Sequence, residues 1–86
     1  DVNMVQFTYD EKTILVQYTI KKFENEEIVL EKLKNLLSEK DIQRNIDTLI
    51  GTQLVRRIGP DNIQNNESHT ELPELPENLK TIIDNL

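Results

Sequence analysis

The chain has 86 residues, no cysteine and a formal net charge of −6. This length supports one small hydrophobic core, and the lack of cysteine excludes a disulfide framework and a thiolate metal site. Residues 1–58 have a net charge of −1 and residues 59–86 a net charge of −5, so an almost neutral body precedes an acidic tail. Such a charge distribution is a poor match for a phosphate backbone and favours a protein partner.

No apolar run approaches the roughly 20 residues that a membrane-spanning helix needs, and no signal-peptide pattern opens the chain. The sequence begins with Asp1 rather than methionine, so we expect it to be a piece of a longer protein. Together with the lack of cysteine, these features predict an intracellular protein of the nucleus, the cytoplasm or both, with no membrane contact.

The first third of the chain permits two interpretations. Apolar residues alternate, as in a strand, at Val5, Phe7 and Tyr9, and again at Ile14, Val16, Tyr18 and Ile20. Residues 10–23 also suit a helix that Asp10 caps, with Lys21 and Lys22 at its C-terminal end. We predict the helix, because the pattern of elements further along the chain requires a first helix here. The alternative is a β-hairpin followed by helices.

The second helix is predicted from residue 28 to residue 37, after a polar turn at residues 24–27 and with room for a very short strand before it. Its apolar residues repeat at helical spacing: Val29, Leu30, Leu33, Leu36 and Leu37.

The third helix is the best defined. Ser38 is its expected cap, with Asp41 completing a capping-box-like start, and its apolar stripe consists of Ile42, Ile46, Leu49 and Ile50. Gly51 suits a C-cap.

Two strands and a last helix are expected after Gly51. Leu54–Ile58 is interpreted as a strand, Gly59–Asn62 as a turn, and Ile63–Gln64 as the start of the return strand. Residues 64–76 are polar and form a predicted linker. Pro76 suits the first turn of the last helix. The apolar side of this helix consists of Leu79, Ile82, Ile83 and Leu86. We expect this side either to pack back on the domain or to dock on a neighbouring protein.

These elements predict a mostly α-helical fold with a small β-sheet. A capped helix that runs through a tight turn into a strand with basic residues is typical of a winged helix, which is a three-helix bundle with a β-wing. We therefore divide the chain into a winged-helix domain at 1–63, a polar linker at 64–76 and a C-terminal amphipathic helix at 77–86.

No catalytic constellation is visible in the sequence. His69 is the only histidine and stands in an acidic, proline-flanked stretch, where a solvated side chain is expected rather than a metal ligand. Glu26 and Glu27 are interpreted as solvated carboxylates, and the glycosylation pattern at residues 66–68 has no secretory signal beside it. We expect a chain that is not an enzyme on its own and needs no cofactor or metal.

The candidate partner-binding residues are polar or basic: Lys40, Gln43 and Arg44 on the exposed side of the third helix, and Arg56 and Arg57 on the wing. A DNA-reading winged helix would present these positions to the major groove and to phosphates. However, Glu39, Asp41 and Asp47 share the third helix and would repel phosphates, and such mixed charge is typical of a polar protein interface.

The segment from Ile42 to Arg57, IQRNIDTLIGTQLVRR, resembles the last winged-helix domain of cullins, in which I-[KR]-[KR]-x-I-[DE]-x-L-I runs without a gap into [YL]-[LV]-x-R. The matching positions are Ile42, Arg44, Ile46, Asp47, Leu49, Ile50, Leu54, Val55 and Arg57. Bacterial winged-helix regulators share a related pattern, L-S-x-x-x-[IV]-x-R-x-I-x-x-L, but usually place alanines in the second helix, and this sequence contains none.

The resemblance implies a non-catalytic module of a cullin-like ubiquitin-ligase scaffold that helps to position the RING subunit, the ubiquitin-conjugating enzyme or other ligase subunits. When Leu15 and Val16 are aligned with the I-V pair of cullins, the position of the lysine that accepts a ubiquitin-like modifier is occupied by Ile20. Lys21 and Lys22 are adjacent to this position but out of register. This implies an unmodified scaffold, as in the anaphase-promoting complex. The alternative function is DNA binding by a transcriptional regulator that uses the same surface.

Overall fold

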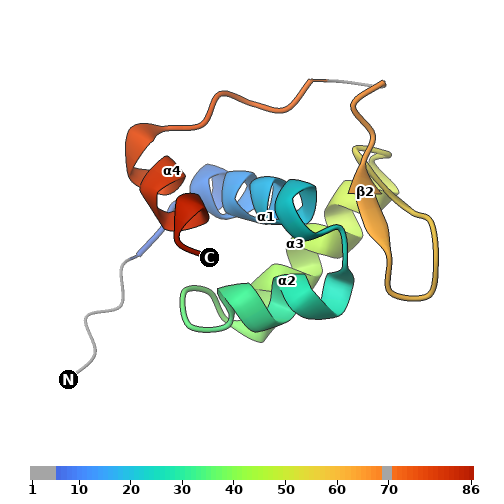
Figure 1. Ribbon diagram of the computed structural model, residues 1–86, viewed down its shortest axis with the longest axis horizontal. Helices are drawn as coiled ribbons and strands as arrows, with labels where there is room; N and C mark the ends of the chain where they lie inside the picture. The colour runs from blue at the N-terminus through green and yellow to red at the C-terminus, as the bar shows by residue number, and fades with distance from the viewer. Residues whose placement is uncertain (1–5, 69–70) are drawn as a thin grey trace.

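Four helices and one two-stranded hairpin make up the described part of the chain, which is residues 6–68 and 71–86 of the computed structural model (Figure 1). In chain order the elements are α1 (Tyr9–Phe23), α2 (Glu26–Leu33), α3 (Glu39–Gly51), β1 (Val55–Arg57), β2 (Ile63–Asn65) and α4 (Glu77–Asp84). The prediction of a mostly helical chain with a small β-sheet is confirmed.

The first helix decides between the two interpretations of residues 10–23. α1 is helical from end to end, and its buried residues include Leu15, Val16, Thr19 and Ile20. This spacing belongs to one face of a helix, whereas a strand would point Leu15 and Val16 to opposite sides. The strand interpretation is wrong here, because burying a helical face outweighs the β-propensity of the branched side chains.

The cap of α1 lies two residues before the predicted one. Thr8 is the N-cap: its hydroxyl accepts a hydrogen bond from the Glu11 N–H at 3.1 Å, and the Glu11 carboxylate accepts one from the Thr8 N–H at 2.8 Å. This reciprocal capping box satisfies two backbone donors at once, whereas Asp10 lies inside the first turn. Residues 6–8 form no strand, and Val5 lies outside the described residues.

An isolated β-bridge occupies the position of the very short strand that the sequence allows before α2. Asn25, the N-cap of α2, forms an antiparallel bridge with Asn62. The Glu26 N–H donates to the Asp61 carbonyl oxygen at 2.7 Å. These contacts fasten the start of α2 to the hairpin, although the two segments are far apart in the sequence.

The start of α3 is the predicted one, but its end is not. Ser38 is the N-cap, and its hydroxyl accepts from the Asp41 N–H at 3.1 Å. Gly51 is the last helical residue rather than the C-cap, and the left-handed backbone falls at Gln53, with a φ of 67°. The reason is local: the N–H and hydroxyl of Thr52 both donate to the Thr48 carbonyl oxygen, which carries the last turn past the glycine.

The two strands pair in an antiparallel hairpin of three residues each, in the register Val55↔Asn65, Arg56↔Gln64 and Arg57↔Ile63. The strand β1 is shorter than the predicted Leu54–Ile58. The turn around residues 59–62 is present and is closed by the Ile58 N–H donating to the Asn62 carbonyl oxygen at 2.9 Å. The return strand begins at Ile63 as predicted. It continues to Asn65, which is beyond residue 63, where we expected the domain to end and the linker to begin.

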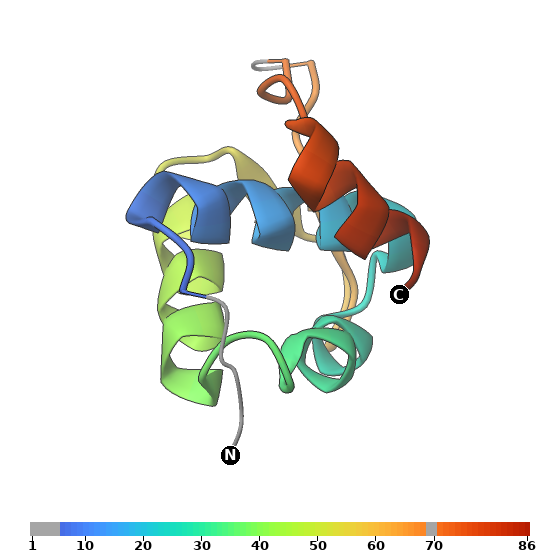
Figure 2. The ribbon, with the colours of Figure 1, turned by 90° about the vertical axis from the view of Figure 1, so that its left-hand side faces the viewer.

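Helix α1 lies in the middle of the fold and contacts α2, α3, β2 and α4 (Figures 1 and 2). Helix α4 packs back on the same chain, which was one of its two expected placements. Its Leu79 and Ile83 are buried, and the Lys22 amine of α1 donates to the Ile83 carbonyl oxygen at 2.9 Å. Pro76 is the N-cap of α4 rather than a residue of its first turn.

Candidate functional site

The exposed side of α3 carries two of the predicted contact residues. Because Ile42, Ile46 and Leu49 are buried, the side chains two positions before and two positions after Ile42 point outward. Lys40 and Arg44 are both exposed and lie one helical turn apart. Neither side chain makes a hydrogen bond or an ion pair with another described residue. They form a basic ridge, by which we mean Lys40 and Arg44 together.

Two other predicted contact residues, Gln43 and Arg57, meet at a carboxylate of α2. Glu26 accepts a hydrogen bond from Arg57 Nη1 at 2.8 Å and another from Gln43 Nε2 at 3.0 Å. The side chain of Glu26 is only 14% exposed and that of Arg57 is 41% exposed. We call these three residues the Glu26 clamp, because they join α2, α3 and β1 through one side chain.

The charges of the clamp stabilise each other. The hydrogen bond from Arg57 lowers the pKa of Glu26, burial opposes this, and the Gln43 hydrogen bond and the Arg57 charge lower the pKa further. In return, the hydrogen bond and charge of Glu26 raise the pKa of Arg57. Both groups are therefore charged at neutral pH, and the pair presents little net charge to a partner.

Arg56 points to the other side of the hairpin, since neighbouring residues of a strand alternate. Its Nη2 donates to Gln64 Oε1 at 3.1 Å, and Gln64 Nε2 donates to the Glu24 carboxylate at 3.2 Å. The guanidinium is held along the outer face of the hairpin and stays exposed. Arg56 is therefore an exposed cation on the hairpin with no carboxylate of its own chain paired to it among the described residues.

Of the five predicted contact residues, the structure thus brings Gln43 and Arg57 together, and the residue that joins them was missed. The prediction that Glu26 lies in a polar turn as a solvated carboxylate is wrong, because Glu26 is the first residue of α2 and its side chain is largely buried. Arg57 lies 31 residues further along the chain, so no local pattern reveals the contact.

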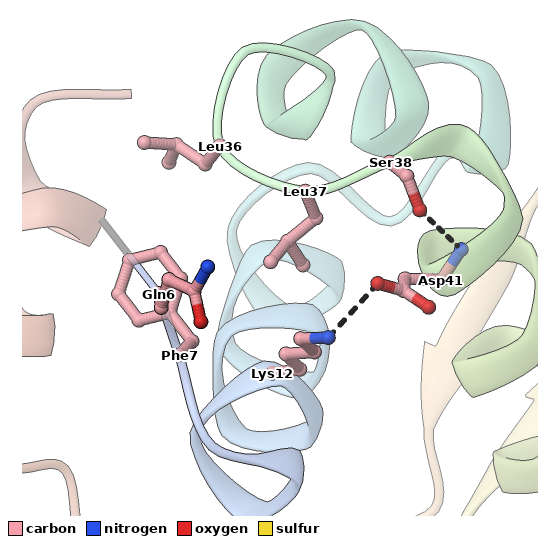
Figure 3. Close-up of a pocket in the computed structure, with 7 residues that line it drawn as sticks. All are labelled: Gln6, Phe7, Lys12, Leu36, Leu37, Ser38 and Asp41. Carbon is pink, nitrogen blue, oxygen red and sulfur yellow. Dashed lines mark hydrogen bonds and ion pairs between the residues drawn. The ribbon is translucent and has the colours of Figure 1, made fainter. Parts of the chain in front are cut away.

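An open pocket of about 270 Å³ lies between the start of α1, the α2–α3 loop and the start of α3 (Figure 3). Its apolar lining comes from Phe7, Leu36 and Leu37. On its polar side Lys12 points at Asp41, with 2.9 Å between Nζ and Oδ2 (Figure 3), and this hydrogen bond lowers the pKa of Asp41. Because the two charges neutralise each other, the polar side of the pocket carries little net charge.

Within residues 6–68 and 71–86, no group of three or more His, Cys, Asp or Glu side chains is placed to hold a metal ion. His69 lies outside the described residues. In the same part of the chain, no helix is both long enough and apolar enough to cross a membrane.

Comparison with known proteins gives no match: no family model, no curated protein and no solved structure is similar to this chain.

Proposed function

We propose that this chain is a non-catalytic protein-interaction module, built as a winged helix with α4 added. The order of α1, the Asn25–Asn62 bridge, α2, α3 and the β1–β2 hairpin supports this architecture. In a winged helix a short strand between the first two helices pairs with the hairpin, and the bridge occupies that place. The docking face consists of the basic ridge on α3 together with Arg56 on the wing.

The observation that favours a protein partner over DNA is the Glu26 clamp. Affinity for DNA comes largely from lysine and arginine side chains that neutralise phosphates. Arg57 already donates to a largely buried carboxylate of its own chain, so a phosphate would have to displace Glu26 to reach it. Asp47, which accepts a hydrogen bond from Gln43, adds a further negative charge beside the clamp.

Gly51 leaves a bare backbone at the C-terminal end of α3, beyond the basic ridge. A helical glycine destabilises a helix by roughly 0.5–1 kcal/mol relative to alanine. The fold does not require this glycine, since its φ is not positive and a Cβ built on it would meet nothing within 4 Å. A bare backbone at an exposed helix end allows another protein to approach closely.

The partner class that we propose follows from the resemblance of Ile42–Arg57 to cullins. In a cullin-like ligase scaffold this module would help to position the RING subunit and the ubiquitin-conjugating enzyme. Such a role needs a rigid face and no reacting group. Lys40 and Arg44 would make the contacts, and the Glu26 clamp would hold α3 and the wing in a fixed relation.

Pull-down of purified RING subunits and ubiquitin-conjugating enzymes by the immobilised chain tests this proposal. We expect Lys40→Glu/Arg44→Glu to weaken capture by about tenfold or more, since like charges placed against a partner's acidic groups are strongly unfavourable. The matched control is Lys21→Glu/Lys80→Glu, which makes the same change of charge on α1 and α4. Capture that is the same for both variants, or absent for the unchanged chain, would overturn the proposal.

DNA binding is the second candidate function, and the exposed basic ridge is the observation in its favour. A mobility-shift assay with duplex DNA separates the two functions, because phosphate contacts are strongest at low salt. A shift at low salt that Lys40→Glu/Arg44→Glu abolishes would favour DNA. Absence of any shift at low salt would remove this candidate.

A further inference from the structure

An open groove of about 310 Å³ runs between α2 and the first residue of α3, lined by Glu27, Leu30, Glu31, Lys34 and Glu39. It is next to the basic ridge but separate from it, since Glu39 and Lys40 are successive residues of a helix and point about 100° apart. No step of the proposed function uses it.

The floor of the groove is apolar. Leu30 is half-buried and packs against the hydrophobic core from its edge, so part of its side chain stays open to the groove. Ile28, which lies one helical turn before Glu31, is 39% exposed on the neighbouring side of α2. Ile28 is not among the residues that line the groove, so an apolar side chain of a partner would find its apolar contact on Leu30.

The rim of the groove is negative even after its internal pairing is taken into account. Lys34 Nζ lies 3.0 Å from Glu31 Oε2, so these two charges largely cancel. Glu27 and Glu39 have no hydrogen-bonded or ionic partner for their carboxylates among the described residues. Two unpaired carboxylates thus remain around one apolar floor.

A purely structural explanation accounts for part of this pattern. Glu27 and Glu39 stand in the first turns of α2 and α3, where a carboxylate favours the helix dipole. That explains why each residue is acidic. It does not explain why the two carboxylates flank a concave surface with the half-buried Leu30 at its base.

We infer that this groove is a docking site for a short cationic segment of another protein. One apolar side chain of that segment would rest on Leu30, and a lysine or arginine on each side of it would pair with Glu27 and Glu39. The negative charge of the groove, in a chain of net charge −6, is complementary to a cationic segment and disfavours a nucleic acid at this surface. The inference goes beyond the proposed function, because it concerns another surface and a partner segment of opposite charge.

The probe for the test is a fluorescein-labelled peptide with two lysines on each side of one leucine. We expect it to raise the fluorescence anisotropy on binding to the chain and to shift the amide resonances of residues 27–39. Exposed ion pairs are weak individually, so Glu27→Gln/Glu39→Gln should weaken binding by about two- to tenfold. The charge reversal Glu27→Lys/Glu39→Lys should weaken it by more than tenfold.

Three controls separate the groove from general attraction between opposite charges. Glu71→Gln/Glu74→Gln removes the same charge at two exposed positions before α4 and should leave binding unchanged. A peptide with glycine in place of leucine should bind more weakly. Circular dichroism confirms that the variants remain folded. Equal weakening by both pairs of variants, or equal binding of the two peptides, would overturn the inference.

Failure of the peptide to bind at the groove can be distinguished from failure of the proposed function. Lys40→Glu/Arg44→Glu removes positive charge from the neighbouring ridge and should bind the cationic peptide as tightly as the unchanged chain, or more tightly. If ligase components fail to bind but the peptide still maps to the groove, the proposed function fails and this inference stands.

Discussion

The Glu26 clamp gives the sharpest prediction, because a single carboxylate connects three elements. The substitution Glu26→Gln keeps the size of the side chain and removes its charge. It weakens the contact to Arg57 Nη1, now 2.8 Å, and leaves an amide where Gln43 Nε2 now donates to an oxygen at 3.0 Å. We expect the start of α2, the middle of α3 and β1 to become less firmly attached to one another.

The magnitude follows from burial. A hydrogen bond to a charged group contributes about 1.5–3 kcal/mol where it is shielded from water, and an exposed ion pair contributes about 0.2–1 kcal/mol. Glu26 is nearly shielded and Arg57 is not, with 14% and 41% of their side chains exposed. We therefore expect Glu26→Gln to lower the free energy of unfolding by about 1–2 kcal/mol, which lowers the Tm of a domain of this size by roughly 5–15 °C.

The effect should depend on pH in a defined direction. Arg57 lowers the pKa of Glu26 below its ordinary value of 4.5, so the folded state binds this proton less readily than the unfolded state. The stabilisation is thus complete above pH 4.5 and is lost as the pH falls through the lowered pKa. The difference in unfolding free energy between the unchanged chain and Glu26→Gln should be constant near pH 7 and shrink in acid.

Urea unfolding of the unchanged chain, Glu26→Gln, Arg57→Gln and the double variant measures the interaction as a double-mutant cycle. We expect a coupling energy of about 0.5–1.5 kcal/mol at pH 7. Glu71→Gln, which removes the same charge from an exposed residue, is the control. A coupling energy within error of zero, or a loss in Glu26→Gln that persists unchanged in acid, would refute the reasoning.

Three further substitutions test other contacts by urea unfolding. Gly51→Ala should raise the unfolding free energy by less than about 1 kcal/mol, because Gly51 is the last residue of α3 and not an interior one, and a decrease would show that the fold does need the glycine. Leu79→Ala should lower it by about 2–4 kcal/mol, because Leu79 is fully buried; a loss below about 1 kcal/mol would mean that α4 contributes little to the core. Thr8→Ala should lower it by about 1 kcal/mol through loss of the capping box, and no change would contradict the capping role.

Sequence patterns were sufficient where the determinants lie within a few residues of one another. The start of α3 is an example, since the Ser38 hydroxyl accepts from a backbone N–H only three residues away. The turn before Ile63 is another, because glycine, proline, aspartate and asparagine follow one another there. In residues 13–20 the local signals conflicted, and only the position of the segment at the centre of the fold decides for the helix.

The contacts that define the candidate site could not be predicted in the same way. Glu26 meets Arg57 because the Asn25–Asn62 bridge brings the start of α2 to the hairpin, and that bridge joins two segments that are far apart in the sequence. A carboxylate before an apolar run is equally consistent with solvent exposure. The position of Leu30 at the base of a groove likewise depends on how α2 and α3 lie against each other.

The opposite charges on neighbouring sides of α3 allow one last prediction. Exchanging the two residues in Glu39→Lys/Lys40→Glu leaves the net charge of the chain at −6 and keeps one carboxylate and one amine in the first turn, so the helix-dipole contribution changes little. The two exchanged charges are on adjacent residues, closer together than the roughly 8 Å over which salt screens charges. The exchange therefore changes the electrostatic field close to α3 and hardly changes it further away. If the ridge and the groove act locally, the exchange should weaken both capture of ligase components and binding of the cationic peptide, with little change in stability. If only overall charge matters, both should be unaffected, and the assignment of separate acidic and basic surfaces on α3 would be wrong.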